Sequence, residues 1–178
     1  PVLMKITCKE NLAFRYTTKN EQLANVEKQN YFNERISGFR LSYSNHIDLT
    51  SVIAYGKDSV DTRRTTFTYY AQPAGVKAMS DVYGYKKMYS DDKYAPFDDT
   101  LDEEYAKIGS LQEVTLSDGG RIRVDYELNR FEPEGYQSYG GIRIKSLLTD
   151  NQAENKVDTV TYRYEAGRPT FFVFYSNH

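Results

Sequence analysis

The segment "SDGGRIRVDY", residues 117–126, decides the fold, because it places two glycines between two alternating runs. In "EVTL" just before it and in "RIRVDY" at its end, apolar and polar residues alternate, which is the period of a β-strand. Glycine adopts positive φ without steric cost, and Asp-Gly is a frequent hairpin corner. The segment therefore predicts a β-hairpin that turns at Gly119 and Gly120. A phosphate-binding glycine loop is the alternative, but such loops precede a helix.

The same hairpin pattern occurs near the start of the chain. "LMKITCKENLAFRYTT", from Leu3, has two alternating runs around a polar turn. Aligning Ile6 with Val114 and Phe14 with Val124 requires a two-residue difference in turn length. We therefore interpret this hairpin as a copy of the one at residues 111–128.

A second pair of segments is also similar. Residues 49–70 and 144–164 each contain an apolar run, a polar turn, the tripeptide Val-Asp-Thr and an aromatic-x-aromatic ending. The spacing is too long for a solenoid repeat. We predict two duplicated halves, about 1–80 and 110–178, joined by an acidic, tyrosine-rich connection at 81–109.

The remaining elements follow from local pattern. Alternating "ISGFRLSYSN" (36–45) and aromatic "RPTFFVFYS" (168–176) predict strands, whereas polar, amide-rich 21–34 predicts a loop or irregular helix. In "TLDEEYAKIG" (100–109), Thr100 is the expected cap, Glu103 completes a capping box and Gly109 ends a short helix.

Length and composition favour one all-β domain over residues 1–178. The 17 tyrosines and 9 phenylalanines suit a pleated surface. We predict a meandering, mainly antiparallel sheet of about ten strands with one short helix. The expected core residues are Ile6, Phe14, Leu41, Ile53, Phe67, Val114, Val124, Ile144 and Tyr162.

Several function classes receive no support from composition. The net charge is −2 and the basic residues are dispersed, so no nucleic-acid partner is expected. No run approaches the roughly 18 apolar residues of a membrane span. A single cysteine, Cys8, excludes an internal disulfide. Because the sequence begins at Pro1, we expect it to be a piece of a longer or processed precursor.

Three of these sequence segments, taken in their order along the chain, resemble a known family. "LQEVTLSDGGRIRVDYELNRF", then "YGGIRIKSL", then "VDTVTYRYE" are similar to the tyrosine-aspartate (YD) and rearrangement-hotspot (RHS) type repeats of large Bacteroidota surface proteins. The resemblance covers most of residues 3–165, and "SDVYGYKKMYSD" resembles a further family segment, with Tyr83 where tryptophan is usual. Its most specific residues are Gly140, Gly141, Arg143, Ile144 and Lys145.

The resemblance implies a non-enzymatic structural or interaction segment that is exported to the cell surface, without cofactors. From the residues, Gly140 and Gly141 are expected to permit a bulge or a close strand approach, and Arg143 and Lys145 to face solvent or a neighbouring repeat. The apolar run "FFVFY" near the chain's end predicts an edge strand that pairs with a neighbouring repeat or another copy.

Other chemistry stays open as alternatives. The first is a carbohydrate-binding module in segment 83–94, whose tyrosine rings could stack on sugars: Tyr83, Tyr85, Tyr89 and Tyr94. Acidic residues at 91–104 could hold calcium, but they lack the spacing of a known loop and favour a solvated surface. With histidine only at positions 46 and 178, no nucleophilic catalytic site is expected, and no metal site is predicted.

Overall fold

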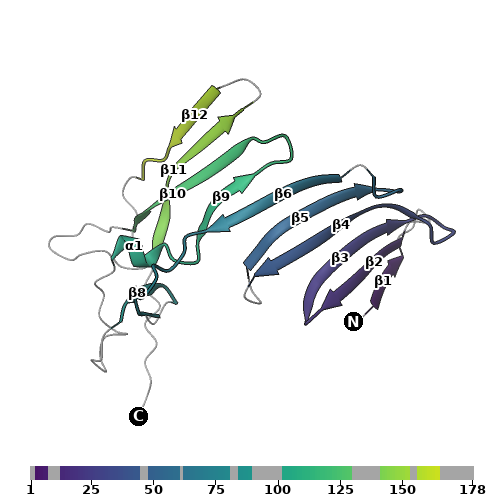
Figure 1. The fold of residues 1–178 in the computed structure, drawn as a ribbon, viewed down its shortest axis with the longest axis horizontal. Coiled ribbons are helices and arrows are strands. Elements are labelled where there is room, and N and C mark those ends of the chain that lie inside the picture. The colour runs from purple at the N-terminus through teal and green to yellow at the C-terminus, as the bar shows by residue number, and fades with distance from the viewer. Residues whose placement is uncertain are drawn as a thin grey trace, which may run out of the picture. The chain divides into compact units, whose positions relative to one another are not determined.

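The structure, a computed structural model, describes residues 3–7, 13–44, 48–60, 62–80, 84–89, 102–129, 141–152 and 156–164. Within these residues it is mainly antiparallel β, as predicted, with one short helix, α1 (Glu103–Ala106). Ten strands form one sheet in the order β1-β2-β3-β4-β5-β6-β9-β10-β11-β12 (Figure 1). Their bounds are β1 Leu3–Thr7, β2 Ala13–Lys19, β3 Gln22–Gln29, β4 Arg35–Ser44, β5 Asp48–Gly56, β6 Thr62–Tyr69, β9 Leu111–Thr115, β10 Arg121–Leu128, β11 Ile142–Asn151 and β12 Lys156–Thr161. Two short strands, β7 (Ala78–Ser80) and β8 (Lys86–Met88), pair separately.

The chain divides into two compact units, which we describe one at a time. Unit 1 comprises Pro1–Thr68, Leu111–Arg123 and Thr149–Asp158. Unit 2 comprises Tyr69–Ser110, Val124–Leu148 and Thr159–His178. The division into duplicated halves at about 1–80 and 110–178 stays a prediction.

The hairpin predicted around the two glycines is confirmed. Strands β9 and β10 pair antiparallel, with Val114 opposite Ile122. Gly119 has φ +89°, in the region that favours glycine. The corner is closed by the Leu116 amide, which donates to the Gly120 carbonyl at 2.8 Å, and by the Gly120 amide, which donates to Asp118 Oδ1 at 2.9 Å. This segment therefore turns a hairpin.

The first hairpin has the same register as the second. Ile6 lies opposite Phe14, just as Val114 lies opposite Ile122, and both members of each pair are eight positions apart. The expected two-residue difference in turn length is therefore wrong. By strand register, Phe14 corresponds to Ile122 and not to Val124.

The loop or irregular helix expected at 21–34 is also wrong, because most of it is strand β3. Asn20 and Glu21 take φ values of 51° and 66° and join β2 to β3 in a tight turn with the backbone twist of a hairpin. Strand β3 then pairs on both sides, with β2 and with β4. Two ladders of backbone hydrogen bonds override the weak strand propensity of its amide-rich sequence.

The predicted helix exists but begins later than expected. Asp102, not Thr100, is its N-cap, and its side chain accepts a hydrogen bond from the Glu104 amide at 2.8 Å. Thr100 lies outside the described residues. Gly109 has φ +83° just beyond the helix, as its predicted role as a stop requires.

The single core expected from the sequence is largely wrong. Of the predicted core residues only Val124 is buried, at 6 % exposure, whereas Tyr162 is 40 % exposed and the other described members are half-buried. The side chain of Ile6 lies outside the described part. Strand register also places Ile53 opposite Arg40, on the other face of the sheet from Leu41, which lies opposite Val52.

Candidate functional site

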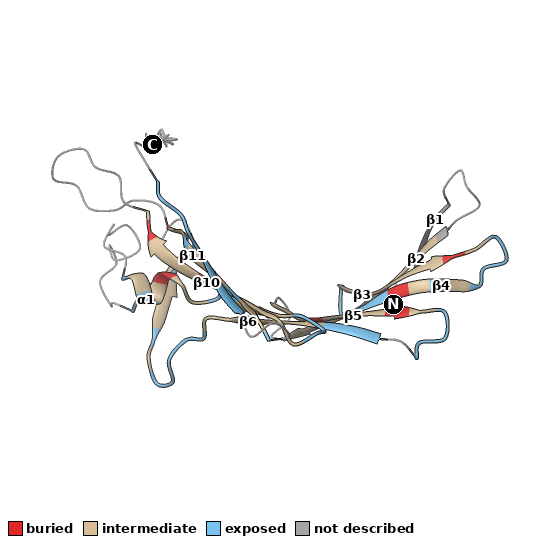
Figure 2. Ribbon diagram, turned by 90° about the horizontal axis from the view of Figure 1, so that it is seen from above, coloured by how far each residue is buried: buried red, intermediate tan, exposed pale blue. Residues whose placement is uncertain are grey.

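In unit 1, cross-strand register assigns alternating residues to the two faces of the sheet. One face, here called the polar face, carries Arg15, Thr17, Asn25, Glu27, Arg40, Ser42, Ser51, Tyr55 and Thr66, together with Ile53 and Arg64. The opposite face, here called the apolar face, carries Phe14, Tyr16, Val26, Phe39, Leu41, Val52 and Ala54, together with Lys28, Ser37, Arg63 and Thr65. Along β2–β5 most residues are half-buried or exposed, and buried stretches are short (Figure 2). Each face is therefore a candidate for contact with another molecule.

The polar face is organised around Tyr55. It lies directly opposite Gly38 on β4, which in turn lies opposite Glu27 on β3. The Tyr55 ring crosses the bare glycine, so that its hydroxyl reaches Glu27 Oε1 at 3.4 Å. Tyr55 is 5 % exposed, and burial together with the Glu27 carboxylate raises its pKa. This makes Tyr55 a structural anchor rather than a reactive phenol.

Two arginines complete this cluster. The guanidinium carbons of Arg35 and Arg40 lie 5.1 and 5.8 Å from the Tyr55 ring centroid. Arg35 also lies 3.7 Å from Glu27 and donates to the Lys57 carbonyl at 2.6 Å. These interactions connect β3, β4 and the β5–β6 turn, so we assign the cluster to strand alignment.

The apolar face has a continuous row of side chains across four strands. Tyr16, Val26, Phe39 and Ala54 lie opposite one another in sequence from β2 to β5. Phe39, in the middle of the row, is 50 % exposed. The other members of the row are half-buried, and the row continues to Arg63 on β6, so it exposes one large apolar side chain and no extended patch.

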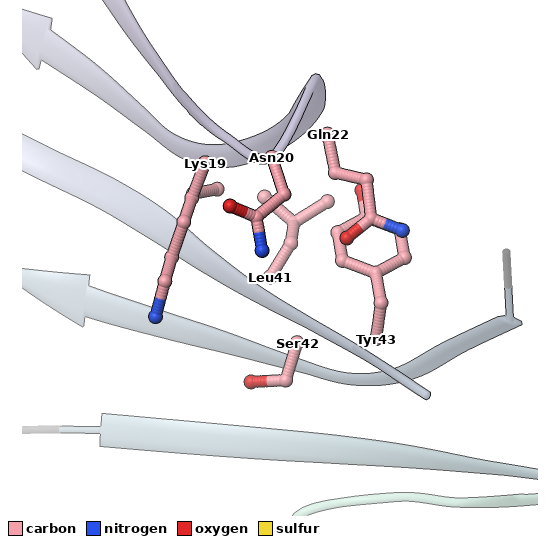
Figure 3. A pocket seen from close by; sticks show the side chains of 7 residues that line it. Lys19, Asn20, Gln22, Leu41, Ser42 and Tyr43 are labelled. Carbon is pink, nitrogen blue, oxygen red and sulfur yellow. The ribbon is translucent and has the colours of Figure 1, made fainter. Parts of the chain in front are cut away.

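Two hollows border β4. The first, about 640 Å³, is lined by residues that alternate onto both faces: Ser37, Gly38, Phe39, Ala54, Tyr55, Gly56, Val60, Thr62 and Arg63. The second, about 490 Å³, lies beside the β2–β3 turn and is lined by Lys19, Asn20, Gln22, Ala24, Leu41, Ser42 and Tyr43 (Figure 3). The Tyr43 hydroxyl donates to the Leu23 carbonyl at 3.0 Å, which fixes the end of β4 beside β3.

In unit 2, the residues that carry the family resemblance connect neighbouring strands. Arg143 Nε donates to Glu127 Oε1 at 2.6 Å, and its guanidinium carbon lies 4.3 Å from the Tyr164 ring centroid. Lys145 lies 3.8 Å from Asp125. The Tyr164 hydroxyl donates to the Ile144 carbonyl at 2.6 Å. Arg143 and Lys145 thus form ion pairs with β10.

Gly141 lies just before β11, against the ring of Tyr85. It is buried with φ +89°, and a Cβ there would collide with the Tyr85 ring. The Tyr85 ring therefore occupies the space where a side chain at position 141 would stand. Tyr89 is 46 % exposed, with the Lys77 ammonium 5.5 Å from its ring centroid. Tyr83, Tyr94 and Gly140 lie outside the described residues, so the structure does not bring the four tyrosines together as one site.

Three acidic residues of the 91–104 stretch are described. Asp102 caps α1, Glu103 accepts a hydrogen bond from Lys107 at 2.7 Å, and Glu104 is exposed. Residues 90–101 lie outside the described part. Among described side chains, histidine, cysteine, aspartate and glutamate nowhere gather in a group of three that could hold a metal.

Lys107 connects α1 to β10. It lies 2.7 Å from Glu103 and 3.4 Å from Asp125. Burial lowers its pKa, but hydrogen bonds and charge from these two carboxylates outweigh burial and raise the pKa overall. Nearby, the Tyr70 hydroxyl donates to the Val124 carbonyl at 2.9 Å. The Tyr70 ring packs edge-on against the Tyr126 ring, with 6.0 Å between the ring centroids. Residues of 69–110 thus cover part of β10.

Sequence reasoning missed the Gly38–Tyr55 contact and the apolar face. The signal for the first was a glycine inside the alternating run "ISGFRLSY", since glycine within a strand marks close approach. No protein-family model, curated protein or solved structure matches the chain. No helix among the described residues is long and apolar enough to cross a membrane.

Proposed function

We propose that the chain is a non-enzymatic structural and interaction segment of an exported bacterial surface protein, similar to YD and RHS repeats. The observation that supports this most directly is the set of contacts that the family-like residues make. Gly141, Arg143 and Lys145 each contact a neighbouring element of unit 2: the Tyr85 ring, Glu127 and Asp125. We interpret these contacts as ones that hold neighbouring elements in alignment.

The proposed partner is a neighbouring repeat of the same protein, or another copy, that pairs with an edge strand. β1 and β12 are the terminal strands of the ten-stranded sheet. Every residue of β12 is exposed, including Val157 at 58 % and Val160 at 54 %. An exposed β-branched edge offers backbone donors and acceptors to another strand. The run "FFVFY", the other edge predicted from the sequence, lies outside the described residues.

The location is tested on cells of the source organism. An antibody raised against residues 1–178 should label intact cells, and external protease should remove the signal. Labelling that requires permeabilised cells would contradict export.

The edge is tested with the double variant Val157→Lys/Val160→Lys. Lysine on an exposed edge strand opposes strand addition and leaves the folded sheet intact. We expect the variant to lose end-to-end association in light scattering while keeping its melting temperature. A matched control is Val60→Lys, which changes an 82 % exposed valine in the connection between β5 and β6. Unchanged association of the double variant would contradict edge pairing. A glycan-array signal that Tyr89→Ala abolishes would favour the carbohydrate-binding alternative.

A further inference from the structure

Three arginines that are far apart in the sequence lie on the polar face of unit 1. Arg15 alternates onto this face from β2, Arg40 from β4 and Arg64 from β6. All three residues are exposed. Within the described part of the chain, none of the three has an ion-pair partner. Positive charge that is dispersed along the sequence is therefore gathered on one face of the folded sheet.

The strand register fixes how these arginines are spaced. Arg40 and Arg64 both lie opposite Ile53, one on each side of β5. Their Cα atoms are thus two strand spacings apart, about 10 Å. Ile53 between them is half-buried, and Arg15 lies two strands from Arg40 in the neighbouring row. We call Arg15, Arg40, Ile53 and Arg64 the arginine patch.

Negative charge near the arginine patch is scarce among the described residues. Glu27 lies 3.7 Å from Arg35, which balances its charge. The next carboxylate that alternates onto the polar face is Asp48, opposite Ser44. Ser44 is about 14 Å along β4 from Arg40, which is more than the Debye length of about 8 Å at physiological salt. The arginine patch therefore has an excess of positive charge that an anionic partner would neutralise.

The apolar face lacks a comparable cluster in the part of the sheet that is described. On β3–β6, the positive residues that alternate onto it are Lys28 and Arg63. They belong to β3 and β6, three strand spacings or about 14 Å apart. Lys28 is also half-buried, whereas Arg63 is exposed. An extended anion would therefore meet adjacent positive groups on the polar face only.

The side chains around the arginine patch suit a carbohydrate. Thr17, Ser42 and Thr62 supply hydroxyl groups on the same face, which can both donate hydrogen bonds to sugar hydroxyls and accept them. Ile53 offers alkyl surface to the C–H groups of a sugar ring. Tyr55, the aromatic residue of this face among those described, is only 5 % exposed, so it offers no platform on which a nucleic-acid base could stack. These features favour a polysaccharide over a nucleic acid.

We propose that the arginine patch binds an acidic polysaccharide, with carboxylate groups of the sugar chain paired to Arg40 and Arg64 and a sugar ring over Ile53. Arginine suits this role because its planar guanidinium donates two parallel hydrogen bonds to one carboxylate. The register requires the polysaccharide to run across the strands. The inference goes beyond the proposed function, because it adds a ligand of different chemistry on a sheet face, away from the edge of β12 and from the tyrosines of segment 83–94.

Affinity electrophoresis of the full chain, through gels that contain polygalacturonate, tests the proposal. Polygalacturonate is an unbranched chain of carboxylated sugars, and dextran is the neutral comparison. At about 10 mM salt, where the Debye length is about 30 Å, we expect polygalacturonate and not dextran to retard the protein. The retardation should disappear at about 1 M salt, where the Debye length is about 3 Å.

Two adjacent arginines give a matched pair of variants. Arg64→Gln should weaken binding by about tenfold, since charge-assisted hydrogen bonds to a carboxylate are lost. Arg63→Gln removes the same charge from the neighbouring exposed position, which alternates onto the apolar face, and should leave the retardation unchanged. Arg40→Gln/Arg64→Gln should abolish the retardation. Circular dichroism confirms that each variant is folded.

Several results would overturn the proposal. Absence of retardation by polygalacturonate, or equal retardation by dextran, would show that the arginine patch does not bind acidic sugars. Equal losses in Arg63→Gln and Arg64→Gln would show that the binding is not specific to the polar face. Tighter binding of polyglutamate or of a single-stranded oligonucleotide would assign the arginine patch to an acidic protein or to nucleic acid. None of these results decides the edge pairing of the proposed function, which light scattering of the β12 variant measures.

Discussion

Tyr55 covers Gly38 across the β4–β5 ladder, and an added Cβ at position 38 would lie 2.6 Å from Tyr55 Cζ. The pair is an aromatic ring that fills the space of a missing side chain. Gly38→Ala should therefore displace the ring from Glu27 and cost about 1–3 kcal/mol of unfolding free energy, measured by urea denaturation. Gly56→Ala is the control, because nothing lies within 4 Å of its added Cβ. Equal stability of the two variants would contradict the contact.

Gly141 and Tyr85 allow a second test, in unit 2. Gly141→Ala introduces both a strained backbone and a collision with the Tyr85 ring. Gly75→Ala has the same strain at φ +76° with open space around it, so it isolates the backbone cost of about 1–2 kcal/mol. We expect Gly141→Ala to be the more destabilising by thermal melting. Adding Tyr85→Ala should recover part of the loss, and strict additivity would show that the ring does not cover the glycine.

Val124 is the residue on which the sequence-based core prediction holds. Val124→Asp places a charge at a 6 % exposed position and should cost several kcal/mol, enough to unfold the region around β10. Val160→Asp, at a 54 % exposed position, is the matched control and should change stability by less than about 1 kcal/mol. Far-ultraviolet circular dichroism with a thermal ramp compares the two. A cooperative, native-like melt of Val124→Asp would refute the assigned face.

The pair Glu113 and Arg123, 2.7 Å apart, predicts a pH effect. The hydrogen bond from Arg123 lowers the pKa of Glu113, with burial opposing it. A carboxyl whose folded pKa is lowered stabilises the fold above its unfolded pKa, and this stabilisation is lost as pH falls through the folded value. Glu113→Gln should thus be less stable than wild type at neutral pH, with the gap closing in acid. Urea midpoints at several pH values measure it, and a constant gap would exclude this origin.

The sequence predicted strands where alternation was strong and failed where pairing partners decide. The segment around Gly119 contains both the turn residues and the two alternating runs, so its hairpin can be recognised from this segment alone. Strand β3 lacks such a signal, because its amide-rich residues form a strand only with a ladder on each side. Alternation also cannot reveal which face is covered. Phe39 and Val124 look equivalent in sequence, yet only Val124 is buried. The sequence showed that Arg143 and Lys145 are charged, but it could not show which residues of β10 they pair with, because that depends on how the strands are arranged.

In unit 1, strands β1–β6 each pair with their neighbours in the chain. Such an array behaves nearly as a one-dimensional stack, in which each strand is held by the interfaces on its two sides. Opening should therefore start at β1, which has a neighbour on one side in the sheet order, and proceed inward. Amide hydrogen exchange should form a gradient along the strands, slowest at β4 and β5, where the Tyr55 cluster joins three strands. The order of strands in the sheet would thus also be the order in which the protein comes apart.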